Sequence, residues 1–366
     1  MDIQNFPKSR SFLIAGLVAL LTLFALWLRL IPMFTMGNAD YLSMVASDDP
    51  LFNLRQVEQL LHNGLEYAWF DPMTLYPGGA SIYWGPLFPL LIAVSCLITG
   101  AATRPDIIGT ALLVPPLLGA VIVIVMYYVG KVCGDWKTGL LAAAFTAVIS
   151  GQFFYRSLYG YIDHHIAEVL FSTIFCLLYI YAMLSEKDEH ISLRDIGTYK
   201  QTLLFAGFAG VAYLLGLFTM PTMVLFAMIV GIFTVIQFTI DVFRGRTSEY
   251  LLITNCVIFS IAIIGLLLFG LKSPGIDLST YSIGHIYAYC GLIGGTIFLY
   301  LLAHYLKGKE KYYFPGALIG CGILFAGILF VVSYELFNLL VIDFFAFFGQ
   351  AAVTNTVQEA RGWTMD

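Results

Sequence analysis

Three short segments, far apart in the chain, carry side chains that could bind a divalent metal ion or activate a substrate. The first runs from Ser47 to Arg55 and places Asp48 and Asp49 directly before Pro50. Proline favours the first turn of a helix and keeps the preceding residue extended, so Asp49 should project from the beginning of a helix. Its carboxylate could serve in catalysis, or it could do no more than cap that helix.

The second segment runs from Arg156 to His165 and ends in Asp163, His164 and His165. If these last three residues are extended, Asp163 and His165 point to one side and His164 points to the other. A carboxylate and an imidazole that converge at a membrane surface would suit a divalent metal ion. The alternative is an aspartate that caps the next helix beside solvated histidines. Ionisable groups at membrane depth favour the functional interpretation.

The third segment, from Thr354 to Ala360, contains Glu359 and follows a stretch rich in phenylalanine. Taken alone, it is more typical of a solvated loop glutamate than of a catalytic one, because exposed glutamate is common. Its interest depends on whether it lies on the same side of a membrane as the other two segments.

The composition shows what kind of protein must position these residues. Hydrophobic residues make up 60% of the 366 residues and charged residues 11%, against about 45–50% and about 25% in soluble domains. Too little polar surface exists to cover the apolar mass, so the sequence predicts an all-α polytopic membrane protein. The net charge of -5 argues against nucleic acid as a partner, since that needs a basic surface. The six cysteines occur singly, as small core residues do.

Ten apolar runs approach the roughly 20 residues that a spanning helix needs. They are 11–33, 86–102, 107–130, 138–155, 165–184, 203–219, 221–240, 250–271, 283–303 and 316–334. Basic residues gather in five places that the positive-inside rule assigns to the cytoplasm. These are Lys8/Arg10, Lys131/Lys137, Lys187/Arg194/Lys200, Arg244/Arg246 and Lys307/Lys309/Lys311.

An even number of runs separates neighbouring basic clusters, except that three runs lie between Arg10 and Lys131. We therefore expect run 86–102, which is short and interrupted by two prolines, to lie in the outer interface without crossing. About nine spans remain, with the N-terminus inside, a large outer loop at 34–106, and the chain outside from about residue 335. All three segments with reactive side chains then face the same side of the membrane.

In this combination the chain resembles the catalytic subunit of the membrane oligosaccharyltransferases in its archaeal form. The resemblance rests on four stretches: Asp49-Pro50-x-Phe52-Asn53-x-Arg55 is similar to the first acidic motif, Trp69 to Phe88 to the rest of the first outer loop, Gly160 to His165 to the second acidic motif in its Asp-His-His form, and Thr356-Val357-Gln358-Glu359 to a Thr-Ile-X-Glu motif. Their order and side agree with the family pattern.

The resemblance implies a GT-C-type glycosyltransferase in the cell membrane, with its active site on the extracytoplasmic face. It would transfer an oligosaccharide from a dolichyl (pyro)phosphate carrier to asparagine in Asn-X-Ser/Thr sequons, with inversion at the sugar. Its partners would be dolichyl-phosphate-linked oligosaccharide, sequon-bearing acceptor proteins and membrane lipid.

The family also assigns roles to individual residues. Asp49, Asp163 and His165 would bind Mn²⁺ or Mg²⁺, and the imidazole favours Mn²⁺. Asp49 and Glu359 would be catalytic, because their carboxylates would accept hydrogen bonds from the two N–H groups of the acceptor carboxamide. Glu359 would thereby also bind substrate. Arg156 would bind substrate phosphate, or it would be only a counter-ion for Asp163.

The family pattern predicts a transmembrane glycosyltransferase domain at residues 1–334, including the outer loop, and the start of a long outer loop at 335–366. Val357 replaces the usual isoleucine, and His165 stands where many members have a carboxylate. Members normally continue with further helices and a soluble domain carrying Trp-Trp-Asp-Tyr-Gly, a motif that this sequence lacks. We therefore expect the chain to be the truncated N-terminal part of such an enzyme.

Two other functions remain open at this stage. Another multipass glycosyltransferase that uses a lipid-phosphate sugar would share an acidic first loop, but it would need neither the Asp-x-His pair nor the Glu359 loop. A membrane transporter would place ionisable groups in the middle of broken spans. The apolar runs of this chain are nearly free of charge, which disfavours the transporter.

Overall fold

A computed structural model describes residues 8–35, 40–46, 48–185, 199–246, 248–338 and 342. The helices are α1 (Lys8–Thr35), α2 (Asp49–His62), α3 (Leu87–Thr99), α4 (Arg104–Cys133), α5 (Trp136–Val148), α6 (Gln152–Tyr155), α7 (His165–Leu184), α8 (Lys200–Thr219), α9 (Val224–Arg244), α10 (Glu249–Phe269), α11 (Ile283–Tyr305), α12 (Tyr313–Val332) and α13 (Tyr334–Phe337). Two short strands, β1 (Phe70–Asp71) and β2 (Ala80–Ser81), pair antiparallel.

Within the described residues, eight helices are long and apolar enough to cross a membrane. The expected span at 138–155 differs, because α5 ends at Val148 and α6 begins only at Gln152. Gly151 between them has a φ of +104°, a conformation that cannot continue a helix. The helix α3 has 13 residues and a length of about 20 Å, short of the roughly 30 Å hydrocarbon core. That run 86–102 does not cross stays a prediction.

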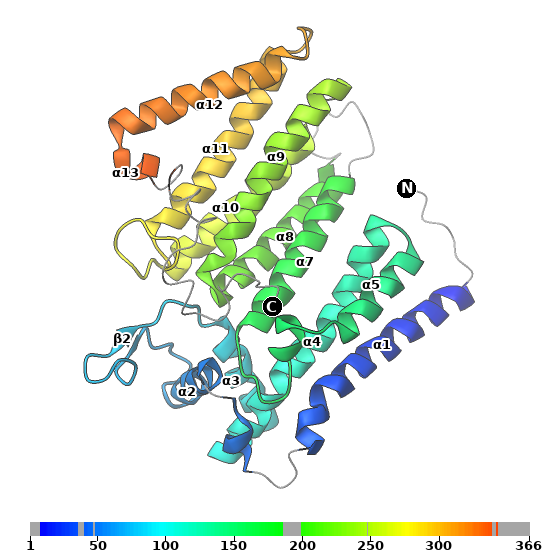
Figure 1. Ribbon diagram of the computed structural model, residues 1–366, viewed down its shortest axis with the longest axis vertical. Helices are drawn as coiled ribbons and strands as arrows, with labels where there is room; N and C mark the ends of the chain where they lie inside the picture. The colour runs from blue at the N-terminus through cyan, green and yellow to red at the C-terminus, as the bar shows by residue number, and fades with distance from the viewer. Residues whose placement is uncertain are drawn as a thin grey trace, which may run out of the picture. The chain divides into compact units, whose positions relative to one another are not determined.

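The chain forms two compact units, of which the first comprises residues 1–237 and 247–300. Within it, α1 packs on α4, α4 on α5 and α7, α7 on α8, and α8 on α10 (Figure 1). The helix α7 contributes to two buried clusters, with Leu170 in the cluster shared with α2, α3 and α4, and Phe175 in the cluster shared with α8 and α10. The helix α7 therefore packs into both buried clusters of this unit.

The second unit comprises residues 238–246 and 301–366. Its α12 is apolar throughout, yet Phe314 is the one residue of this helix that is buried within the described part of the chain. The ammonium group of Lys311 donates a hydrogen bond of 2.7 Å to the carbonyl of Phe243. This contact joins the end of α9 to the connection before α12.

The first loop folds against α2. The Arg55 guanidinium pairs with the Asp71 carboxylate on β1, and that carboxylate also accepts hydrogen bonds from the Thr74 hydroxyl and, at 3.1 Å, from the Met73 N–H. Burial by itself raises the pKa of Asp71, but the Thr74 and Met73 hydrogen bonds and the Arg55 charge hold this pKa below its usual value. The ionised pair thereby fixes the β1–β2 hairpin to the helix that begins at Asp49.

Candidate metal centre

Asp163, His164 and His165 gather their potential ligand atoms within 4.8 Å of one another. Asp163 and His164 are buried, and His165 is half-buried at the first position of α7. The extended conformation considered for these residues is not adopted, because His164 has helical angles (φ -67°, ψ -21°). His164 therefore joins the group, and the expectation that it points away is wrong.

The Asp163 carboxylate is surrounded by positive and polar groups. It forms an ion pair with the Arg156 guanidinium, and it accepts a hydrogen bond of 3.3 Å from the His165 backbone N–H. Nδ1 of His164 also lies 3.3 Å from its Oδ1 atom. Of the two roles considered for Arg156, the structure shows the counter-ion contact, and phosphate binding stays a prediction.

Glu168 orients the ring of His165. Nδ1 of His165 lies 3.1 Å from Oε2 of Glu168, and Oε1 of Glu168 accepts a hydrogen bond of 3.1 Å from the Thr222 hydroxyl. A carboxylate partner favours the proton on Nδ1, which leaves the Nε2 lone pair for a metal ion. Glu168 was not among the site residues expected from the sequence, although its spacing of three residues from His165 on a helix was a usable signal.

His164 is almost completely buried. Its ring stacks on the Trp84 indole with centroids 5.2 Å apart, and Trp84 in turn contacts the Phe52 ring of α2 edge-on at 4.8 Å. Burial lowers the pKa of His164 to about 4, so the imidazole is neutral at pH 7. Within the described residues, neither buried ring nitrogen has a hydrogen-bond partner, because the 3.3 Å contact of Nδ1 with the Asp163 carboxylate lacks hydrogen-bond geometry. Such atoms call for an explanation, and together with the nearby carboxylate they fit a bound divalent cation.

Asp49 lies at the beginning of α2, as the sequence predicts, with Asp48 at the capping position. Among the described residues, the Asp48 side chain makes no capping hydrogen bond, and Asp48 itself has a φ of +67°. The negative charge of Asp49 adds to burial in raising the pKa of Tyr83, which adjoins Trp84. This places Asp49 close to the residues that cover His164.

The two acidic segments are also joined through the backbone. The Ala46 N–H donates a hydrogen bond of 2.9 Å to the Gly160 carbonyl. Gly160 has a φ of +111°, and a Cβ atom there would lie 2.8 Å from the Met44 carbonyl oxygen. Glycine at this position therefore lets the chain before Asp49 run beside the chain before Asp163.

The structure thus brings together two of the three predicted metal ligands, Asp163 and His165. Asp49 is not a member of the closely spaced ligand group found among the described residues, so its role as a ligand stays a prediction. Glu359 lies outside the described residues, and its catalytic role stays a prediction as well.

Arg29 supports the second acidic segment from within the membrane-spanning helix α1. Its buried guanidinium donates hydrogen bonds of 2.8 Å to the Ser157 hydroxyl and 3.3 Å to the Ala147 carbonyl, and its own carbonyl accepts the Tyr159 N–H at 2.9 Å. The sequence shows a charge in an apolar run, which is a signal of function, but it does not reveal these partners.

The chain is similar in sequence to known proteins. The profile of the family described as oligosaccharyl transferase STT3, N-terminal, matches residues 12–357. Over 331 residues the chain is 29% identical to the dolichyl-monophosphooligosaccharide–protein glycotransferase AglB of Haloferax volcanii, covering 86% of this chain and 31% of that relative. Over 238 residues it is 24% identical to the dolichyl-phosphooligosaccharide-protein glycotransferase 3 of Archaeoglobus fulgidus, covering 65% and 27%.

Solved structures share the fold. The archaeal oligosaccharyltransferase AglB from Archaeoglobus fulgidus, in complex with an inhibitory peptide and a dolichol-phosphate, superposes with a TM-score of 0.84 at 21% identity, covering 96% of this chain and 41% of that one. An Archaeoglobus fulgidus oligosaccharyltransferase in complex with Zn and sulfate gives a TM-score of 0.73 at 21% identity, covering 87% and 40%.

A polytopic helical protein of the GT-C type, as the sequence predicts, is therefore confirmed. The chain belongs to the oligosaccharyl transferase STT3 family, in its N-terminal part. It spans less than one third of the length of the two curated relatives described above.

Proposed function

We propose that this chain forms the membrane-embedded part of an oligosaccharyltransferase. It would transfer a glycan from a dolichyl (pyro)phosphate carrier to the asparagine of Asn-X-Ser/Thr sequons. The observation that carries the proposal is the Asp163, His164 and His165 group, in which both ring nitrogens of His164 are buried without a hydrogen-bond partner among the described residues, in a chain of the matching family.

Asp163 and His165 would hold a divalent ion together with Asp49. When bound, the ion would act as a Lewis acid on the phosphate leaving group and as a template for the substrates. A mixed carboxylate and imidazole set is compatible with several divalent metals, and we favour Mn²⁺ over Mg²⁺ because imidazole suits the softer ion. The Glu168 carboxylate would keep Nε2 of His165 available.

The remaining steps belong to side chains of this polypeptide. A carboxamide nitrogen is a poor nucleophile because its lone pair is delocalised into the carbonyl. Asp49 and Glu359 would accept hydrogen bonds from the two N–H groups of the acceptor amide and turn the nitrogen out of conjugation. Attack from the side opposite the leaving phosphate would invert the anomeric centre, and Arg156 would exchange part of its contact with Asp163 for the phosphate.

We place the site on the extracytoplasmic face, on the basis of the positive-inside rule. In Tyr83→Cys and Arg104→Cys variants, a membrane-impermeant thiol reagent applied from outside should label both positions alike. A Lys137→Cys variant serves as the control and should react only after permeabilisation. Labelling of just one of positions 83 and 104 from outside would contradict both the orientation and the non-crossing run at 86–102.

Acceptor dependence tests the proposed reaction. The chain, extended with the C-terminal region of a relative, is given dolichyl-linked oligosaccharide, Mn²⁺ and a fluorescent Asn-X-Thr peptide, with Asn-X-Ala as the control. Glycosylation of the Thr peptide alone is expected, with loss in Asp163→Asn. Donor consumption without a sequon peptide would indicate a different lipid-phosphate-sugar transferase and would contradict the proposal.

A further inference from the structure

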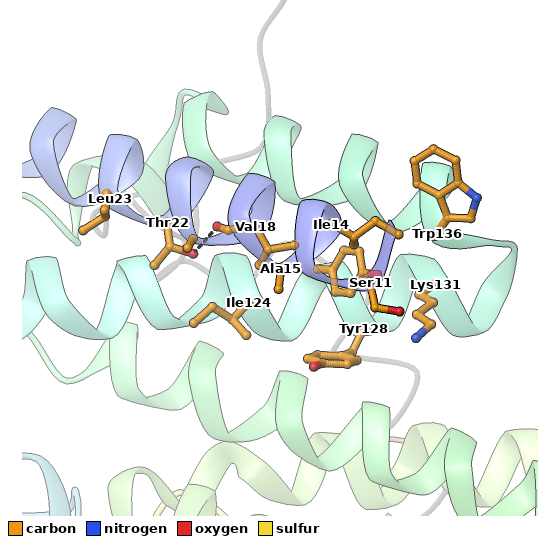
Figure 2. A pocket seen from close by; sticks show the side chains of 12 residues that line it. Ser11, Ile14, Ala15, Val18, Thr22, Leu23, Ile124, Tyr128, Lys131 and Trp136 are labelled. Carbon is orange, nitrogen blue, oxygen red and sulfur yellow. Dashed lines mark hydrogen bonds between the residues drawn. The ribbon is translucent and has the colours of Figure 1, made fainter. Parts of the chain in front are cut away.

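An apolar groove runs between α1 and α4, away from the candidate metal centre. Its cavity volume is about 550 Å³, and its walls include Ile14, Ala15 and Val18 of α1 and Ile124 and Tyr128 of α4 (Figure 2). Cavities of roughly 300–1,000 Å³ hold small organic molecules. Because α1 and α4 are both membrane-spanning helices, the surrounding solvent is lipid, and the molecule available to this groove is a hydrocarbon chain.

The length of the groove matches one leaflet of a bilayer. The α1 residues that line it extend from Ser11 to Leu23, a rise of about 18 Å at 1.5 Å per residue. Half of a typical hydrocarbon core is about 15 Å. A single lipid molecule could therefore lie along the groove, with its head at the Ser11 end and its chain reaching toward the bilayer centre.

Basic and aromatic side chains gather at the Ser11 end. The Arg10 guanidinium lies 4.7 Å from the centre of the Trp136 ring, and the Lys137 ammonium lies 5.7 Å from the centre of the same ring. Lys131, which lines the groove, lies 6.0 Å from the ring centre of Tyr128. Aromatic rings and long cationic side chains in this combination are typical of the level of lipid headgroups.

The charge at this end is positive even when the nearby acid is counted. The Asp135 carboxylate accepts the backbone N–H groups of Lys137 and Thr138 at 2.9 Å each, so it is engaged in capping α5. Among the described residues named here, the three cations Arg10, Lys131 and Lys137 stand against the single carboxylate of Asp135. Such a cluster attracts an anionic headgroup more strongly than a zwitterionic one.

We infer that this groove binds an anionic phospholipid, with one acyl or isoprenoid chain between α1 and α4 and its phosphate among Arg10, Lys131 and Lys137. The inference is independent of the proposed transfer reaction, because none of these residues belongs to the candidate metal centre.

The test measures lipid binding by the purified 366-residue chain. The delipidated protein in neutral detergent is titrated with phosphatidylglycerol or with phosphatidylcholine of the same chains, and bound lipid is counted by native mass spectrometry. Phosphatidylglycerol should bind at least tenfold more tightly. The variant Lys131→Gln/Lys137→Gln should lose that preference, whereas the matched variant Lys307→Gln/Lys309→Gln, altered in another basic cluster, should keep it.

A second pair of variants tests the groove without changing charge. Ala15→Phe fills the space along α1 and should abolish tight binding of phosphatidylglycerol. Leu20→Phe, at a position on α1 that is 63% exposed and does not line the groove, should bind as the parent does. Equal affinity for the two lipids, or tight phosphatidylglycerol binding that survives in monodisperse Ala15→Phe protein, would overturn the inference. Equal losses in both double lysine variants would overturn it too.

Discussion

His165 and Glu168 face each other on the first turn of α7, with Nδ1 of the imidazole 3.1 Å from Oε2 of the carboxylate. Residues three apart on a helix lie on the same face, so the helix itself provides this contact. Thr222, far away in the sequence, holds the other carboxylate oxygen at 3.1 Å. The ring orientation of His165, a predicted metal ligand, thus depends on Glu168, which is not itself a predicted ligand.

Replacement of Glu168 by Gln should weaken metal binding. Carboxylates that hydrogen-bond to a metal-ligating histidine typically contribute about 10- to 100-fold to metal affinity. A Gln amide accepts the hydrogen bond from Nδ1–H less strongly than a carboxylate does. Isothermal titration of the purified chain with Mn²⁺ measures the effect. Thr222→Val, which leaves the His165 contact in place, is the control and should lose less. Unchanged Mn²⁺ affinity in Glu168→Gln would show that this contact does not act on a metal site.

Replacement of His165 by Glu should preserve metal binding and shift its preference. A carboxylate is a harder ligand than imidazole and favours Mg²⁺ relative to Mn²⁺. The measurement is the ratio of Mg²⁺ to Mn²⁺ affinities in the variant and in the parent chain. The same ratio in both proteins would count against His165 as a ligand.

Gly160 tests whether the close approach of the two acidic segments matters. Gly160→Ala meets the Met44 carbonyl at 2.8 Å and places alanine at a φ of +111°, whereas Gly151→Ala, at +104°, meets no atom of the described residues within 4 Å. Backbone strain of this kind costs about 1–3 kcal/mol in either variant. Both should unfold at lower temperature, and Gly160→Ala alone should also lose Mn²⁺ affinity. Equal Mn²⁺ affinity in the two variants would show that the close approach of Gly160 to Met44 does not affect metal binding.

The hairpin of the first loop should depend on pH through Asp71. Its folded-state pKa lies below the usual value because the hydrogen bonds and Arg55 outweigh burial. The ion pair therefore stabilises the loop above the unfolded-state pKa of about 3.9, and this stabilisation is lost as the pH falls through the lower folded-state pKa. Hydrogen exchange of residues 70–81 should show protection lost at a higher pH in Arg55→Met. A transition at the same pH in both proteins would contradict this.

The sequence carried enough information for the helical membrane architecture and for the two acidic motifs. Apolar runs of fixed length predict spans, and Asp-Pro or Asp-x-His spacings are visible without coordinates. It did not reveal the break at Gly151, because a backbone angle decides it. Nor did it reveal the stacking of Trp84 on His164 or the hydrogen bond from Arg29 to Ser157. Each contact joins residues from separate elements and is determined by packing.

We propose that two segments far apart in sequence hold one divalent ion. Mn²⁺ affinity, measured by electron paramagnetic resonance on the purified chain, tests it most directly in Asp49→Asn, Asp163→Asn and the control Asp48→Asn. Asp48 is exposed and adjoins Asp49, and asparagine tolerates its positive φ. We expect one Mn²⁺ per chain. Asp49→Asn and Asp163→Asn should each lower Mn²⁺ affinity by more than the roughly 100-fold typical of residues that only hydrogen-bond to a metal ligand. Asp48→Asn should bind Mn²⁺ as the parent chain does. Parent-like Mn²⁺ affinity in Asp49→Asn would contradict it.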